Sequence, residues 1–254
     1  MIETKNLSLT LGDKLILKEM CFHLKRGEFV GILGPNGSGK TSLLRVLSGI
    51  YPNYSGSATL YLIPTKNLKP KGLAQMIAVV PQEEHFPFSY SALEVVLMGR
   101  TPYVGFAGFD SAEDCEIARL AMQQTDCWSF ATRPVDTLSG GEKQRLLIAR
   151  ALAQKTPFIL LDEPSTHLDL AHQQSTFTLL KRLAYEQNMG VACITHEINL
   201  AHQYCDRIYL IKEGHLLGGD TPKSVLTVEK IKSVFGISSQ MVTTCDGKAY
   251  HVFL

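Results

Sequence analysis

The sequence contains no long hydrophobic run and no excess of one charge. Its longest apolar stretches, residues 29–33 and 158–161, are far shorter than the roughly 18 residues that a membrane-spanning helix requires. We therefore expect that the chain does not cross a bilayer. Lys and Arg together number 25 and Asp and Glu 24, so no overall field draws the protein onto nucleic acid or anionic lipid. Nucleic acid is accordingly not expected as a partner.

Signals for secretion and for metal binding are also missing. Residues 1–7 lack the basic start, apolar middle and small-residue cleavage site of a secretory signal, which favours a cytosolic location. The six cysteines show neither Cys-x-x-Cys spacing nor a Cys/His pairing typical of a metal site, and we predict buried, reduced thiols. No internal repeat or Ser/Gly linker divides the 254 residues, of which 45% are apolar, so a sizeable core is available.

Hydrophobic periodicity predicts strands that alternate with helices. Apolar residues at positions 7, 9 and 11 predict a half-buried strand. Further strands are expected over residues 28–33, 158–161 and 191–194, and helices over residues 41–47, 91–98, 111–125, 140–153 and 170–187. Beyond these, the pattern predicts a strand pair at residues 208–212 and 215–218, a short helix near 227–235 and a hairpin around 246–247. The alternation indicates an α/β fold with a parallel sheet.

A glycine-rich segment follows the strand expected over residues 28–33. It reads Gly34-Pro35-Asn36-Gly37-Ser38-Gly39-Lys40-Thr41 and fits the phosphate-binding pattern G-x-x-x-x-G-K-[ST]. The backbone amides of such a loop point inward at a helix start and hold the β- and γ-phosphates of a nucleotide. Lys40 would add a full charge to those phosphates, and the Thr41 hydroxyl is placed to ligate magnesium. A flexible surface turn is the alternative, but the position between a buried strand and an amphipathic helix favours the nucleotide site.

Three polar side chains follow two later strands. Asp162 and Glu163 come directly after residues 158–161, and successive side chains at a strand end diverge, so that one can face a metal while the other meets a water. We interpret Asp162 as the metal-side residue and Glu163 as a general base. His196 follows the strand at residues 191–194, level with these acids if both strands are neighbours in one parallel sheet. The strand ends would then converge on one crevice.

A further segment lies between the phosphate loop and the strand that ends at Asp162. It reads Leu138-Ser139-Gly140-Gly141-Glu142-Lys143-Gln144-Arg145. It resembles the signature of the ATP-binding cassette (ABC) family, and the order of the motifs is that of the family. The resemblance covers essentially the whole chain. It implies a P-loop NTPase of ABC type, with a mixed core sheet and helices, an antiparallel β subdomain and a helical signature subdomain. Residues 1–254 would form a single ABC ATPase domain, in which a helical subdomain at approximately residues 83–155 is inserted within a RecA-like core.

The resemblance also implies roles for the motif residues. Glu163 matches the catalytic glutamate and His196 the γ-phosphate switch histidine, while Asp169 matches an aspartate of the dimer contact. Thr41, Gln82 and Asp162 are expected to bind magnesium. ATP and a magnesium ion are the implied cofactors. The residues expected to bind ATP are Gly34, Pro35, Asn36, Gly37, Ser38, Gly39, Lys40, Thr41, Ser42 and Gln82.

In the family the signature acts on the opposite subunit. Ser139, Gly140, Gly141 and Glu142 would begin a helix whose positive end faces the γ-phosphate held by a second copy. ATP would therefore join a head-to-tail homodimer, and hydrolysis would allow the halves to part. An ordinary helix N-cap is the alternative interpretation of Ser139.

One position departs from the family pattern. The aromatic residue that usually stacks on adenine precedes the glycine corresponding to Gly12, and this sequence has Leu11 there. An apolar contact remains but the π-face is lost, so adenine selectivity and ATP affinity are less secure than phosphate binding. Compensation by a Tyr or Phe from elsewhere in the chain stays open.

The middle of the sequence adds detail. Residues 96–103, 110–114, 133–137 and 167–173 resemble the ATPase subunits of importers for ferric siderophores, haem and cobalamin. This implies a peripheral protein on the cytoplasmic face of the cell (inner) membrane. It would act as a homodimer on two transmembrane permease subunits, fed indirectly by an extracytoplasmic substrate-binding protein. The alternative is a soluble ABC ATPase of an assembly machine, such as one for iron–sulfur clusters.

A short segment beside Gln82 has two interpretations. Glu83, Phe86, Pro87 and Phe88 would form a surface suited to docking a permease helix. Equally, Phe86 and Phe88 would belong to the local hydrophobic core. The sequence does not separate these two alternatives.

Overall fold

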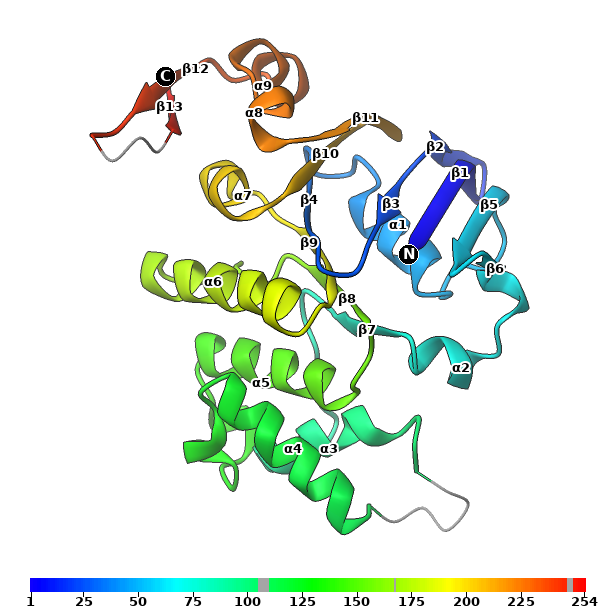
Figure 1. The fold of residues 1–254 in the computed structure, drawn as a ribbon, viewed down its shortest axis with the longest axis vertical. Coiled ribbons are helices and arrows are strands. Elements are labelled where there is room, and N and C mark those ends of the chain that lie inside the picture. The colour runs from blue at the N-terminus through cyan, green and yellow to red at the C-terminus, as the bar shows by residue number, and fades with distance from the viewer. Residues whose placement is uncertain (105–109, 167, 246–248) are drawn as a thin grey trace.

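A computed structural model describes residues 1–104, 110–166, 168–245 and 249–254 and is built around a six-stranded sheet (Figure 1). The strands run in the order β11-β10-β4-β9-β8-β7. All pairs are parallel except β10 with β11, as the predicted α/β pattern requires. Every residue of β4, β8 and β9 is buried, which suits central strands covered on both faces. The strands are β4 (Phe29–Leu33), β7 (Ile77–Val80), β8 (Phe158–Asp162), β9 (Gly190–Ile194), β10 (Arg207–Lys212) and β11 (His215–Asp220).

A second, antiparallel sheet packs beside the first. Its strands are β1 (Ile2–Leu11), β2 (Lys14–Met20), β3 (His23–Leu24), β5 (Ser55–Leu60) and β6 (Ile63–Pro64), in the order β2-β1-β5-β6 with β3 also paired to β1. Leu7 and Leu9 are buried as predicted, but Leu11 is 37% exposed at the end of its strand. Helix α1 (Lys40–Leu47) contacts both β2 and β8 and shares one hydrophobic cluster with the two sheets. This shared core fixes the start of α1 against both sheets.

The chain between β7 and β8 is mainly helical. It contains α3 (Ala92–Leu97), α4 (Ala112–Gln124) and α5 (Gly140–Ala153), with 3-10 turns η2 (Met98–Arg100), η3 (Trp128–Phe130) and η4 (Val135–Thr137). Figure 1 shows the three α-helices gathered at one end of the molecule. The guanidinium of Arg100 donates a buried 2.7 Å hydrogen bond to Asp114, which ties the end of η2 to the first turn of α4. All three α-helices lie within residues 83–155.

Helices and a final hairpin complete the chain. The helices are α2 (Pro70–Ala74), α6 (Leu170–Glu186), α7 (Ile198–Tyr204), α8 (Pro222–Val225) and α9 (Val228–Phe235), with η1 (Thr65–Asn67) before α2. The predicted C-terminal hairpin is confirmed by the antiparallel pair β12 (Ser239–Thr243) and β13 (Ala249–Phe253), while its turn at residues 246–247 lies outside the described residues. Among the helices that the structure describes, none is both long and apolar enough to cross a membrane.

The prediction that all cysteines are buried is wrong for three of the six. Cys127, Cys193 and Cys205 are buried, but Cys21, Cys115 and Cys245 are exposed. Cysteine content and spacing do not show which side of an element a thiol occupies. Cys21 lies between buried Met20 and Phe22 and therefore points outward, while Cys115 lies one position beyond the buried stripe of α4. All six are free cysteines in the structure.

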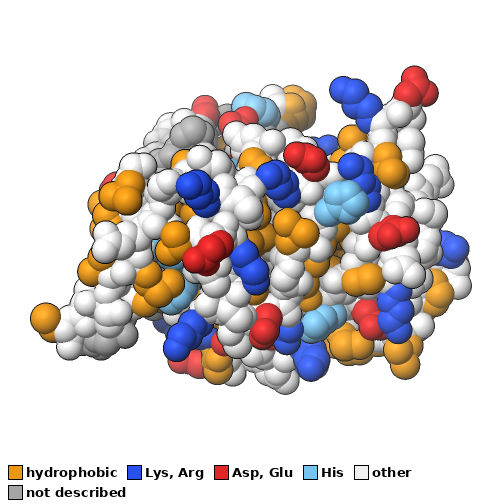
Figure 2. Space-filling view, turned by 90° about the horizontal axis from the view of Figure 1, so that it is seen from above, with side chains coloured by type: hydrophobic (Ala, Val, Ile, Leu, Met, Phe, Trp, Pro, Cys, Tyr) orange, Lys and Arg blue, Asp and Glu red, His pale blue; other side chains and the backbone are white. Residues whose placement is uncertain are grey.

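The surface carries charges of both signs side by side. Figure 2 shows Lys and Arg interspersed with Asp and Glu on the face seen from above, with hydrophobic side chains between them. This distribution agrees with the formal net charge of +1. On this face no charge of one sign dominates.

Candidate functional site

The phosphate loop, residues 34–41, runs from the end of β4 into α1 and requires glycine at specific points. A Cβ on Gly34 would lie 2.1 Å from the carbonyl oxygen of Ile211. Gly39 adopts a φ of 109° and a Cβ there would meet Leu17 at 2.8 Å. Only glycine allows the loop to close this tightly against β2 and β10.

Lys40 is held inside the loop that it follows. Lys40 is only 5% exposed, and its Nζ donates hydrogen bonds to the carbonyl oxygens of Gly34 at 2.9 Å and Pro35 at 3.1 Å. Burial lowers the pKa of Lys40, while the charges of Glu163 and Asp162 act in the opposite direction. The loop therefore places a positive charge beside its own amides, where an anion would bind.

A turn from the C-terminal third supports the loop from behind. The amide of Gly214, in the β10–β11 turn, donates to the Ser38 carbonyl at 3.1 Å, and its own carbonyl accepts from the Lys18 amide at 2.8 Å. Gly214 has a φ of 81°, and a Cβ there would lie 2.4 Å from the Ile16 carbonyl. The turn thus links the phosphate loop to β2.

Asp162 lies at the end of β8 and faces α1. It is 8% exposed, burial raises the pKa of its carboxyl, and a hydrogen bond from the Thr41 hydroxyl opposes that rise. Within the described part of the chain, its Oδ1 has no hydrogen-bond partner, and neither does the buried Oγ of Ser38. Buried polar atoms of this kind normally have a partner. Oxygen atoms beside the phosphate loop are therefore available to a bound group.

Glu163 turns the other way and connects three segments. Its backbone has a φ of 51°, a strained conformation for a residue other than glycine. The carboxylate accepts hydrogen bonds from Gln82 Nε2 at 3.0 Å and Thr166 Oγ1 at 3.2 Å, and His196 Nε2 lies 2.9 Å from its Oε1. The expected divergence of the two acids, and the expected proximity of His196, are therefore both observed.

These side chains line one open cleft along the carboxyl ends of the parallel strands. Residues 36–42, Gln82, Glu163 and His196 lie in its wall, as the sequence analysis expected. Five lining residues were not foreseen, namely Ile16, Ser165, Thr166, Gln173 and Glu197. Thr166 could have been found from its position three residues after Glu163, whereas Ile16 carries no polar signal. No Phe, Tyr or Trp is among the described residues of this lining, which does not extend to Leu11.

The signature forms the start of α5 and does not line this cleft. Ser139 is the N-cap, and its Oγ accepts from the Glu142 amide at 3.3 Å while the Glu142 carboxylate accepts from the Ser139 amide at 2.8 Å. Ser139 and Gly140 are exposed. Asp169 similarly caps α6 by accepting from the His172 amide at 2.9 Å. The structure therefore brings Lys40, Asp162, Glu163 and His196 together and leaves the signature apart from them.

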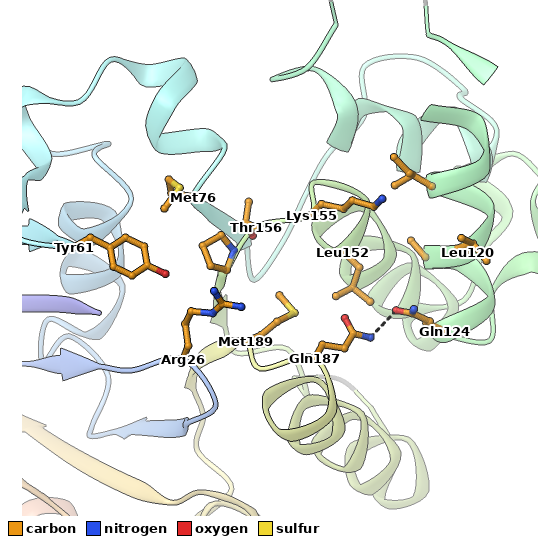
Figure 3. A pocket seen from close by; sticks show the side chains of 13 residues that line it. Arg26, Tyr61, Met76, Leu120, Gln124, Leu152, Lys155, Thr156, Gln187 and Met189 are labelled. Atoms are coloured by element: carbon orange, nitrogen blue, oxygen red, sulfur yellow. Dashed lines mark hydrogen bonds between the residues drawn. The ribbon is translucent and has the colours of Figure 1, made fainter. Parts of the chain in front are cut away.

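A second cavity, of about 500 Å³, lies near the amino ends of the parallel strands, opposite their carboxyl ends (Figure 3). Arg26, Tyr61, Met76 and Met189 line it on the core side, facing Leu152 on α5, and no acidic residue is in its lining. Arg26 Nε donates to the Asn188 carbonyl just beyond α6 at 2.9 Å. The Arg26 guanidinium therefore already satisfies a backbone carbonyl near the C-terminal end of α6. None of the predicted site residues lies in this cavity.

Comparison with known proteins agrees with the geometry of the cleft. A family model described as ABC transporter matches residues 17–166, a span that contains the phosphate loop, Gln82, the signature and both acids. The chain belongs to the ABC transporter family. As an ABC ATPase, it hydrolyses ATP to drive transport.

Several curated ABC proteins are similar over most of the chain. The hemin import ATP-binding protein HmuV of Deinococcus radiodurans is 38% identical, over 92% of this chain and 90% of that protein. The iron(3+)-hydroxamate import ATP-binding protein FhuC of Bacillus subtilis is 34% identical, over 95% and 90%. The cobalamin import ATP-binding protein BtuD of Halobacterium salinarum is 36% identical, over 92% of this chain but 58% of its own length. The chain likewise spans about half, 53%, of the B. subtilis protein YvrA.

Solved structures show the same fold. An inward-facing ABC transporter described as of the metal-chelate type matches 100% of this chain and 96% of its own, with a TM-score of 0.88 at 31% identity. The dimeric cassette MJ0796, a bacterial ABC transporter cassette, matches 87% of this chain and 99% of its own, with a TM-score of 0.76 at 32% identity. The expected ABC ATPase fold, with its mixed sheet and antiparallel β subdomain, is therefore confirmed.

Proposed function

We propose that two copies of this ABC ATPase pair head to tail and share two ATP sites. One observation carries the proposal: Ser139 and Gly140 are exposed at the start of α5 and lie outside the cleft that holds the phosphate loop. The amides and positive dipole end of a helix start bind anions, and here the Glu142 carboxylate already accepts from the Ser139 amide. The triphosphate of a second copy would complete it. The dimeric MJ0796 cassette, at 32% identity, supports this arrangement.

Within each cleft, residues 34–42 would bind the phosphates of ATP. Lys40 supplies the charge and the loop amides supply the donors. Gln82 lies beside the same space, hydrogen-bonded to Glu163. Leu11 would make only an apolar contact with adenine. Asp169, exposed at the start of α6, would contact the second copy.

The donor set also fits a magnesium ion. The unpartnered Oδ1 of Asp162 and the Thr41 hydroxyl provide the oxygen ligands that magnesium prefers, and Gln82 lines the same cleft as Thr41. A magnesium ion bound there would neutralise charge on the β- and γ-phosphates. The burial that raises the pKa of Asp162 would then be offset by the cation.

Glu163 is suited to act as the general base. Its carboxylate is oriented by Gln82 and Thr166 and is only 14% exposed, so its position is well defined. It would accept a proton from the water that attacks the γ-phosphate. His196 lies within hydrogen-bond distance of Glu163 and would contact the γ-phosphate when ATP is bound. The pair would thereby link the base to the presence of the terminal phosphate.

We further propose that the transported ligand is a metal chelate (ferric siderophore or haem) or cobalamin. The relatives that support this are the hemin, iron(3+)-hydroxamate and cobalamin import proteins. The chain covers 90% of the length of the hemin protein and of the iron(3+)-hydroxamate protein. The metal-chelate type transporter structure supports the same class. The ATPase would then be peripheral, on the cytoplasmic face of the membrane, with an extracytoplasmic binding protein delivering cargo. An assembly ATPase for iron–sulfur clusters is the second candidate, although no described observation favours it.

The permease would dock beside Gln82. Phe88 is 69% exposed and Glu83 and Pro87 are exposed too, whereas Phe86 is partly buried and packs against the hydrophobic core. Phe86 therefore fits the local-core interpretation and Phe88 the docking one. Because Gln82 donates to Glu163, movement of this segment would reach the base directly.

Mixing two inactive variants tests the shared site. Chains carrying Ser139→Arg retain the base, and chains carrying Glu163→Gln retain the signature. A mixed dimer has one site with both groups intact and one site with neither. We expect each variant alone to be inactive in phosphate release and the mixture to regain activity. Absence of recovery in dimers shown to be mixed would overturn the head-to-tail arrangement.

Uptake in vesicles tests the transported class. The ATPase would be reconstituted with permease subunits that bind it, and uptake of ferric siderophore, haem and cobalamin measured separately. We expect ATP-dependent uptake of one of them. Failure of all three, together with ATPase activity stimulated by a soluble cluster-assembly partner, would favour the second candidate.

A further inference from the structure

Arg133 holds the start of the signature helix from outside it. One terminal nitrogen of its guanidinium donates to Glu142 Oε1 at 2.8 Å, and the other donates to the Thr137 carbonyl at 3.0 Å. Arg133 precedes the helix in a loop, and its amide is bonded to the Phe130 carbonyl at 3.0 Å. One planar group therefore joins the loop before Ser139 to the first turn of α5.

The Glu142 carboxylate also accepts a hydrogen bond from the hydroxyl of Ser139. Its Oε2 accepts from both the Ser139 amide and the Ser139 Oγ, each at 2.8 Å. These hydrogen bonds, followed by those of Arg133, hold the pKa of Glu142 below its usual value, so that it carries a negative charge at neutral pH. The hydroxyl that would meet a phosphate thus donates to a carboxylate in this state.

The negative charge of Glu142 opposes anion binding at this helix start. A triphosphate arriving at Ser139 would approach a carboxylate that is only 21% exposed, so water screens the repulsion incompletely. Arg133 is the cation paired with Glu142 among the ion pairs of the described residues. Its charge offsets this repulsion, and its hydrogen bond to the Thr137 carbonyl would keep the loop in place when the Ser139 hydroxyl leaves Glu142.

We propose that Arg133 is a positioning residue for the second copy's triphosphate. It neutralises Glu142 and fixes the loop, so that the Ser139 hydroxyl can exchange its hydrogen bond to Glu142 for one to a phosphate oxygen. The inference rests on the proposed action of the signature on the opposite subunit. It assigns to Arg133 a role in ATP-driven dimerisation and none in binding nucleotide to the phosphate loop of its own chain.

The test compares dimerisation with nucleotide binding in chains that carry Glu163→Gln to prevent turnover. Sedimentation with ATP measures dimerisation, and titration with ADP measures binding to the single chain. Removal of one partner of a partly exposed ion pair has an effect of about threefold per site, and hence about tenfold for a dimer with two sites. We expect Arg133→Ala to weaken dimerisation by about that factor and to leave ADP affinity unchanged.

A second substitution separates charge from structural support. Adding Glu142→Gln to Arg133→Ala removes the uncompensated charge, while glutamine retains the capping geometry. We expect the double variant to recover most of the lost dimerisation and the defect of Arg133→Ala alone to shrink at high salt. A double variant as defective as Arg133→Ala would overturn the electrostatic role, as would an Arg133→Ala chain that dimerises normally.

Two controls complete the design. Arg119→Ala removes an exposed pair with Glu116 on α4 and should leave dimerisation and ADP affinity unchanged. Ser139→Arg in the same background tests the underlying proposal. If Ser139→Arg does not impair dimerisation, the shared site itself is wrong. If it abolishes dimerisation while Arg133→Ala has no effect, only the role of Arg133 is wrong.

Discussion

His196 Nε2 lies 2.9 Å from Glu163 Oε1, although the two residues are 33 positions apart in the sequence. They follow neighbouring parallel strands, in which Asp162 pairs with Ile194. The other carboxylate oxygen of Glu163 accepts from Gln82, which follows β7. One carboxylate therefore joins the ends of three adjacent strands, and a change at any of them reaches the same group.

Replacing Glu163 with glutamine should separate binding from turnover. The amide keeps the shape of the side chain but cannot accept a proton, so we expect the rate of phosphate release to fall at least about a hundredfold. ATP affinity should be retained and the ATP-bound dimer should accumulate on size-exclusion chromatography. The matched control is Glu197→Gln, which changes another acid of the same cleft. Turnover near the wild-type rate in the Glu163 variant would show that another group is the base.

Lys40→Ala should weaken nucleotide binding. Charge-assisted hydrogen bonds contribute about 1.5–3 kcal/mol, so the expected loss in affinity is between about tenfold and a hundredfold by calorimetric titration. Part of the effect will come from the carbonyl oxygens of Gly34 and Pro35, which lose their donor. Lys232→Ala, at an exposed position on α9, serves as the control. Equal affinities in all three proteins would contradict the phosphate role of Lys40.

Leu11→Tyr should increase ATP affinity. Stacking of a base on an aromatic side chain contributes about 1–3 kcal/mol, which corresponds to at least about fivefold tighter binding. Leu11 is already 37% exposed, so the larger side chain needs no repacking of the core. Leu62→Tyr places the same new side chain at a 79% exposed position on the β5–β6 turn and should change nothing. An affinity unaltered by Leu11→Tyr would mean that adenine does not lie against the end of β1.

Asp114 should make stability depend on pH in the acid range. Hydrogen bonds from the Ser111 hydroxyl and from Arg100 lower the pKa of Asp114 from 3.8 to about 2. Its stabilising contribution is therefore complete above about pH 4 and is lost as the pH falls through about 2. We expect denaturant unfolding of the wild type to lose stability across this range more steeply than Asp114→Asn. Parallel pH profiles for the two proteins would show that Asp114 titrates normally.

The phosphate loop, both acids and His196 could be predicted because each is a short pattern next to a strong hydrophobic strand signal. The parallel strands then bring their ends together without further information. The hydrogen bond of Thr166 to Glu163 and the pairing of Arg133 with Glu142 could not be predicted in this way. Each depends on rotamers and loop geometry, which hydrophobic periodicity does not encode.

Burial of individual residues was predicted less well than element positions. Leu11 continues the alternation of β1 and yet is partly exposed, because the strand ends there at the turn into β2. Cys115 shows the same problem on a helix, since a shift of one position moves a side chain off the buried stripe. The element is determined by the whole pattern, whereas the exposure of its last residues depends on what packs there.

The contact between Gly214 and Ser38 has a consequence for biosynthesis. The phosphate loop is translated before its neighbouring strands β9 and β10 and before its supporting turn. A nascent chain that ends before Gly214 contains the nucleotide-binding motif without the backbone partners that give it shape. The ability to hold ATP is therefore acquired only after the segment that contains Gly214 has emerged from the ribosome.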